Sequence, residues 1–134
     1  MVDDKEKHLF FPRAWLYART SSGNRAAIED QLRKLTDWAE QKGYSIVGSS
    51  FDIASDNTRW RPGLFVLMHA VRHGNVDLVI VANLSRLAIR KNKLCKILQT
   101  LQKYGTSIQT SAVQLGYDLH LHGLDRILTP KKGT

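Results

Sequence analysis

Four short apolar segments alternate along the chain with longer segments in which apolar residues recur at helical spacing. The apolar segments are residues 14–18, 44–51, 77–82 and 106–112, and each has the length of a strand. The third is the clearest, because every residue from Leu78 to Ala82 is apolar, as in a central parallel strand with both faces buried. The pattern therefore predicts four strands.

The segments between these strands predict three helices. The first covers residues 24–42 and is stopped by Gly43. The second begins near Pro62, since proline is favoured in the first turn of a helix, and ends at Gly74. The third ends near Gly105. The apolar stripes of the three helices are Ile28, Leu32, Leu35 and Ala39, then Leu64, Leu67, Met68 and Val71, then Leu94, Leu98 and Leu101.

The order β-α-β-α-β-α-β predicts an α/β fold, with a mostly parallel sheet of four to five strands flanked by helices. A fifth strand is expected around residues 117–121, where apolar and polar side chains alternate, and one helical turn is expected at 124–128. With 134 residues, the chain is long enough to bury the core of one domain.

The charge distribution indicates a polyanionic partner. The formal net charge is +8, and no Asp or Glu occurs between Leu78 and Tyr117. A field of one sign attracts a polyanion and gains affinity through counterion release, so nucleic acid is the expected partner. The alternative is a helix face that is charged only for solubility. The cations in this window are Arg86, Arg90, Lys91, Lys93, Lys96 and Lys103.

Composition argues against several other classes of protein. The single cysteine, Cys95, excludes a disulfide scaffold and a cysteine-based zinc site, and it fits a reducing cytoplasm. The longest apolar run is too short to span a bilayer, and residues 1–10 do not have the pattern of a secretory signal. His69 and His73 have a spacing that can hold a metal, but no third ligand is evident nearby. We expect a cytoplasmic protein without metal, cofactor or membrane contact.

Candidate chemistry gathers where the predicted strands end. Arg19 and Ser21 follow the first strand, Arg61 follows the second, and Arg86 follows the third. Because the carboxyl ends of parallel strands share one edge of the sheet, these side chains are expected to meet around one phosphate. A guanidinium group carries several hydrogen-bond donors in a fixed geometry that suits phosphate, and a hydroxyl group can act as a nucleophile. The pattern indicates chemistry on a phosphodiester.

These residues resemble the serine site-specific recombinases, the resolvases and invertases. The segment Tyr17-Ala18-Arg19-Thr20-Ser21 is similar to the opening motif of that family, and the similarity continues through Gln31-Leu32. Asp52-x-x-Ser55 and Arg61-Pro62-Gly63-Leu64 follow at the expected spacing, and Leu84-Ser85-Arg86-Leu87 comes after the central strand. The resemblance covers about residues 14–112. We expect an N-terminal extension at 1–13, a catalytic domain at 14–128 and a tail at 129–134, without the long helix and DNA-binding domain that follow in relatives.

The resemblance implies DNA strand cleavage and rejoining without a metal or cofactor. Ser21 would attack a DNA phosphate to leave a 5′-phosphoseryl link and a free 3′-hydroxyl, while Arg19, Arg61 and Arg86 hold the phosphate. No general base is obvious, so positioning and charge stabilisation carry the rate. Family members act on double-stranded DNA as dimers or tetramers. The expected supporting residues are Gln31, Ser55, Asp52 and Arg90, and the expected DNA contacts are Arg59, Lys91 and Lys93.

Two positions depart from the family pattern. Ser85 stands where many relatives have an acid, and Ile89 stands where a further arginine is usual, with Arg90 one place later. These departures motivate a second hypothesis, a recombinase-like module with reduced catalytic activity that serves to bind DNA or another protein. A third hypothesis, based on the fold pattern alone, is an unrelated flavodoxin-like domain that binds a small phosphorylated ligand.

Overall fold

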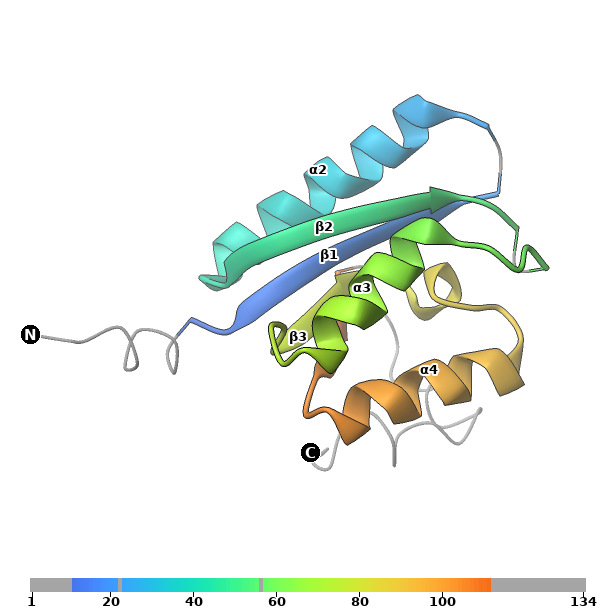
Figure 1. Ribbon diagram of the computed structural model, residues 1–134. Coiled ribbons are helices and arrows are strands. Elements are labelled where there is room, and N and C mark those ends of the chain that lie inside the picture. The colour runs from blue at the N-terminus through green and yellow to red at the C-terminus, as the bar shows by residue number, and fades with distance from the viewer. Residues whose placement is uncertain (1–10, 22, 56, 112–134) are drawn as a thin grey trace, which may run out of the picture.

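The structure is a computed structural model that describes residues 11–21, 23–55 and 57–111 (Figure 1). Its strands are β1 (Arg13–Thr20), β2 (Ser45–Ile53), β3 (Leu78–Val81) and β4 (Ser107–Thr110). Its α-helices are α2 (Arg25–Lys42), α3 (Pro62–Arg72) and α4 (Lys91–Lys103), and a short 3-10 helix, η1 (Leu84–Arg86), follows β3. The predicted element order is confirmed, whereas η1 was not predicted. The expected strand at 117–121 and the turn at 124–128 lie outside the described residues.

The four strands form one parallel sheet with the order β2-β1-β3-β4. The chain moves outward from β1 to β2 and then crosses back to β3, so the direction of winding changes between β1 and β3. Helix α2 covers one face of the sheet, and α3 and α4 cover the other (Figure 1). In open parallel sheets, ligands bind beyond the carboxyl ends of the strands at such a switch point. The fold therefore brings the end of β1 and the segment after β3 to one place.

Alternation along the central strands divides the core into two layers. Ala14, Leu16, Leu78 and Ile80 pack with α2, whereas the residues between them face α3 and α4. All four residues of β3 are buried, as expected for a central strand. Ile46 and Val47, by contrast, are exposed because β2 is the edge strand. Since side chains alternate, Tyr17 and Arg19 belong to the same face of β1.

The first turn of α3 lies directly against β2 at Gly63. A Cβ atom added to Gly63 would be 2.2 Å from the backbone oxygen of Phe51, a contact that no side-chain rotation can relieve. We expect Gly63→Ala to lower the free energy of unfolding by about 2 kcal/mol, within the range for overpacked cores. Urea unfolding followed by circular dichroism measures the change. Gly23→Ala is the matched control, because a Cβ at Gly23 would meet no atom within 4 Å, and a loss as large as that of Gly63→Ala would contradict this account.

Candidate active site

Arg19 connects the end of β1 to the loops that follow β2 and β3. Its side chain is buried, and its guanidinium donates from Nε to the oxygen of Arg86 (2.9 Å) and from Nη1 to the oxygen of Ala54 (2.9 Å). The Nη2 atom donates to the oxygen of Ser85 at 2.5 Å. One guanidinium thus fixes two loops at the carboxyl edge of the sheet.

Two further side chains hold the backbone of Arg19. Gln31 of α2 accepts a hydrogen bond from the Arg19 nitrogen at 3.1 Å and donates to the Arg19 oxygen at 3.3 Å. Arg86 also donates to the Arg19 oxygen, from Nη1 at 2.9 Å. Gln31 and Arg86, both selected from the sequence, therefore lie together at the end of β1.

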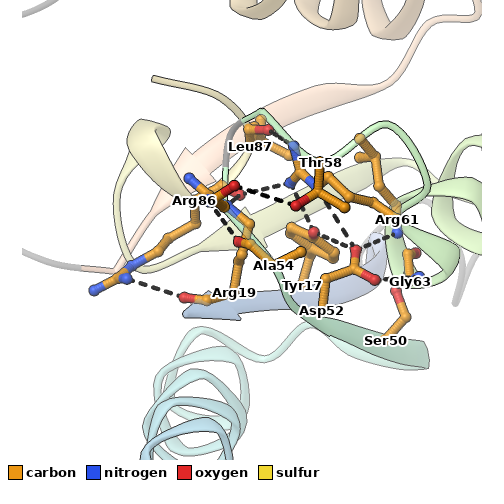
Figure 2. Close-up of polar contacts among 12 residues, drawn as sticks. Tyr17, Arg19, Ser50, Asp52, Ala54, Thr58, Arg61, Gly63, Arg86 and Leu87 are labelled. Atoms are coloured by element: carbon orange, nitrogen blue, oxygen red, sulfur yellow. Dashed lines mark hydrogen bonds and ion pairs between the residues drawn. The ribbon is translucent and has the colours of Figure 1, made fainter. Parts of the chain in front are cut away.

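Arg61 reaches the same place from the beginning of α3 (Figure 2). Its side chain is buried and donates from Nη1 to the oxygen of Leu87 (2.7 Å) and from Nη2 to the oxygen of Arg86 (3.0 Å). Arg19 and Arg61 thus share the Arg86 carbonyl as an acceptor. The three arginines do come together, and the structure adds a role that sequence reasoning missed, because two of them brace the loop after β3 through its carbonyl groups.

Asp52 is the buried carboxylate that balances Arg61. Its Oδ2 atom lies 3.9 Å from Nε of Arg61, and both side chains are at most 5% exposed. Its two oxygens accept from the backbone nitrogens of Gly63 (2.7 Å) and Leu64 (2.8 Å) in the first turn of α3. A carboxylate in this position satisfies donors that have no partner within the helix and interacts favourably with the helix dipole. Asp52 therefore fixes both the guanidinium and the helix from which it projects.

Tyr17 completes this network and was not selected from the sequence. Its hydroxyl donates to Oδ2 of Asp52 at 2.6 Å and accepts from Nη2 of Arg61 at 2.8 Å (Figure 2). Burial and the hydrogen bond to Asp52 raise the pKa of Tyr17 above its usual value, which keeps the hydroxyl neutral. The available sequence signal was its place two residues before Arg19, on the same face of β1.

This raised pKa has a consequence for stability at alkaline pH. The native state holds the phenol proton more tightly than the unfolded chain does. The resulting stabilisation is complete below about pH 10, the ordinary phenol pKa, and is lost as the pH rises above it. We expect the decrease in unfolding free energy between about pH 8 and about pH 11 to be smaller in Tyr17→Phe than in the wild type. Urea unfolding at both pH values measures it. An equal decrease in both proteins would contradict the prediction, and Tyr104→Phe, at an exposed tyrosine, is the control.

Ser21 is exposed and follows immediately after β1, two residues beyond Arg19. The residue is thus accessible to a large substrate. Ser55 is also exposed, and its Oγ lies 3.2 Å from Oγ1 of Thr58 in the loop between β2 and α3. Of the three clustered arginines, Arg19 and Arg61 are buried and Arg86 is partly exposed. The Nε atom of Arg86 is nevertheless buried, and it has no hydrogen-bond partner among the described residues. Nε of Arg61 is in the same situation.

Positive charge concentrates at the edge of the sheet where the helices begin. None of the three described α-helices has an acidic residue in its first turn. Helix α4 instead begins after Arg90 with Lys91, followed by Lys93, and Arg59 precedes α3. Cations at a helix N-terminus oppose the helix dipole and weaken the helix, so their presence there favours an anionic ligand. Ile89 is 66% exposed beside them.

Neither a metal centre nor a membrane-spanning helix is found in the part of the chain that the structure covers. His69 and His73 lie close, with ring centroids 4.1 Å apart, but no cluster of three His, Cys, Asp or Glu side chains is found among the described residues. Within the same residues, none of the helices has the length and apolar character needed to cross a membrane.

Comparison with known proteins identifies the family. The protein-family model described as "Resolvase, N terminal domain" matches residues 14–128 of this chain. The C-terminal catalytic domain of ISC1926 TnpA, an IS607-like serine recombinase, is 29% identical, with a TM-score of 0.69 over 86% of this chain and 78% of that one. The N-terminal catalytic domain of TP901-1 integrase is 22% identical, with a TM-score of 0.70 over 86% of this chain and 92% of that one. A resolvase family site-specific recombinase from Streptococcus pneumoniae is 21% identical, with a TM-score of 0.67 over 87% and 83%.

The last two similarities show a shared fold, whereas the family model covers most of the sequence, including Ser21 and the three arginines. The chain therefore belongs to the serine recombinase family, as a resolvase-type catalytic domain.

Proposed function

We propose that this chain cuts and rejoins double-stranded DNA through a covalent intermediate on Ser21. The observation that carries the proposal is the cluster of Arg19, Arg61 and Arg86 at the carboxyl edge of the sheet, with the exposed residue Ser21 two positions after Arg19. Cations at the beginnings of α3 and α4 support a polyanionic substrate at this edge.

In the proposed reaction, Oγ of Ser21 attacks a DNA phosphorus atom while the bond from phosphorus to the 3′-oxygen breaks. The serine proton passes to solvent and the departing 3′-oxygen takes up a proton. The phosphorus is then bonded directly to Oγ of Ser21 and keeps its bond to the 5′-oxygen of the DNA. The reverse attack by a 3′-hydroxyl rejoins the strand, so no external energy source is consumed. Negative charge builds on the phosphate oxygens in the transition state, and nearby guanidinium groups stabilise it.

We assign different roles to the three arginines. Arg86 is partly exposed, whereas Arg19 and Arg61 are buried, so Arg86 is the group best placed to donate to the phosphate. Arg19 and Arg61 hold the Arg86 backbone in position and bring their positive charge close to the reaction. Gln31 and Asp52 support the two arginines, and Arg59, Lys91 and Lys93 are proposed to contact the DNA backbone. Ser55 and Arg90 are supporting residues, and assembly into dimers or tetramers on DNA is part of the proposal.

The polarity of the protein–DNA link tests this function. The chain is incubated with a nicked duplex of its recombination site, which lets a short cut strand diffuse away and traps the intermediate. The proposal predicts an adduct that resists detergent, with protein on the 5′-phosphate and a free 3′-hydroxyl that a polymerase can extend. Attachment to the 3′-end would overturn the mechanism.

A second candidate is a module that binds DNA without cutting it. It is favoured by one observation, that the guanidinium groups of Arg19 and Arg61 are occupied by backbone carbonyls. Binding to the nicked duplex without any adduct would favour this candidate, and recovery of the 5′-linked adduct would exclude it.

A further inference from the structure

A groove between α3 and α4 lies beside the candidate active site, and its lining does not include Ser21, Arg19 or Arg86. It has a volume of about 380 Å³ and lies on the face of the sheet that α3 and α4 cover. Its apolar lining includes the buried side chain of Met68 and the half-buried side chain of Ile97. Arg61 also lines it, so the groove adjoins the arginine cluster.

Two large aromatic side chains lie in this groove with much of their surface exposed. Trp60 is 63% exposed and Phe65 is 54% exposed, and their ring centroids are 5.4 Å apart. The Phe65 ring is stacked on His69 at 6.4 Å with an angle of 25° between the planes. A row of neighbouring rings along the beginning of α3 therefore offers aromatic faces to a ligand.

The charges around the groove all have one sign. Arg59, Arg72 and Lys96 line it and are exposed, and no Asp or Glu is among the described residues of its lining. An anionic ligand is therefore favoured, and the exposed rings require that this ligand also have flat apolar faces. Nucleic acid bases joined by phosphates have both properties.

We infer that this groove binds single-stranded nucleic acid, namely unpaired bases next to the strand break. The inference rests on the proposed function, which places a cut DNA strand at the adjoining arginine cluster. Cationic grooves lined with aromatic rings bind single strands, because each base can stack on a ring while its phosphate is neutralised. In an intact duplex the base faces are covered by their neighbours, so Trp60 and Phe65 select for strands that are open.

Binding of a labelled oligothymidylate of about 12 nucleotides, measured by fluorescence anisotropy with the full chain, tests the inference. A duplex of the same length is measured in parallel. We expect Trp60→Ala and Phe65→Ala each to weaken binding of the single strand about tenfold and to change duplex affinity by less than about twofold. Val66→Ala is the matched control, because Val66 is a neighbouring exposed apolar residue of α3 that does not line the groove.

Three results would overturn the inference. The first is a wild-type chain that does not bind the oligonucleotide, as expected if the groove takes an acidic peptide. The second is an equal loss of affinity for single strand and duplex in Trp60→Ala and Phe65→Ala, which would indicate that the two rings contact DNA of either form. The third is a wild-type dimer that Trp60→Ala dissociates in sedimentation experiments, because the groove would then be covered by a second copy. A 5′-linked adduct formed by Trp60→Ala in any of these cases would leave the proposed function intact.

Discussion

Replacing Ser21 by alanine is expected to reduce formation of the covalent DNA adduct by roughly four orders of magnitude or more, as loss of a nucleophile does in other covalent enzymes. The phosphoseryl bond has to form on one oxygen atom, and alanine has none. Because Ser21 is exposed and lies outside the strands and helices, the same change should alter the free energy of unfolding by less than about 0.5 kcal/mol. A loss of activity without a loss of stability is the signature expected of a nucleophile.

The neighbouring hydroxyl at Ser22 supplies the control for this experiment. Ser22→Ala removes an identical group one residue later in the chain and should retain at least about half of the wild-type rate of adduct formation. Gel separation of protein–DNA adducts under denaturing conditions measures both variants. Wild-type levels of adduct from Ser21→Ala would show that another residue attacks the phosphate.

Replacing Asp52 by alanine is expected to lower the free energy of unfolding by about 3–5 kcal/mol, the usual cost of removing one partner of a buried ion pair. The change leaves the guanidinium of Arg61 buried without its carboxylate. It also removes the acceptor for the first turn of α3 and the acceptor for the Tyr17 hydroxyl. Adduct formation should fall as well, because Asp52 helps to position both the Arg61 guanidinium and the first turn of the helix from which it projects.

Urea unfolding at neutral pH measures the cost of Asp52→Ala. Asp37→Ala, at an exposed position of α2, is the control and should cost less than about 0.5 kcal/mol. A cost for Asp52→Ala no greater than that of the control would mean that the buried network does not stabilise the fold.

The alternation of apolar segments was sufficient to predict the sheet and its helices, because each central strand is buried on both faces and each helix on one stripe. Leu78 to Val81 illustrates this, since nothing but apolar residues fits a strand covered on both sides. The same rule did not distinguish an edge strand from a central strand. The exposure of Ile46 and Val47 therefore became apparent only from the order of the strands in the sheet.

The candidate site was predictable in its location but not in its internal contacts. Parallel topology places the residues that follow β1, β2 and β3 at one edge, which is why Arg19, Arg61 and Arg86 were expected together. The sequence does not specify where each donor is directed. It could not reveal that the carbonyl of Arg86 accepts from both of the other arginines. The role of Tyr17 was missed because a tyrosine within a buried strand is ordinarily a core residue, and its polar partners come from segments distant in sequence.

The central claim is that one serine hydroxyl, beside a cluster of guanidinium groups, becomes joined to DNA. Mass spectrometry of the trapped adduct after nuclease and trypsin digestion tests it most directly. Cleavage after Arg19 and Arg25 releases residues 20–25, in which fragment ions separate Ser21 from its two hydroxyl-bearing neighbours. We predict a nucleotide phosphate on Ser21, and its appearance on Thr20, Ser22 or any other peptide would contradict the claim.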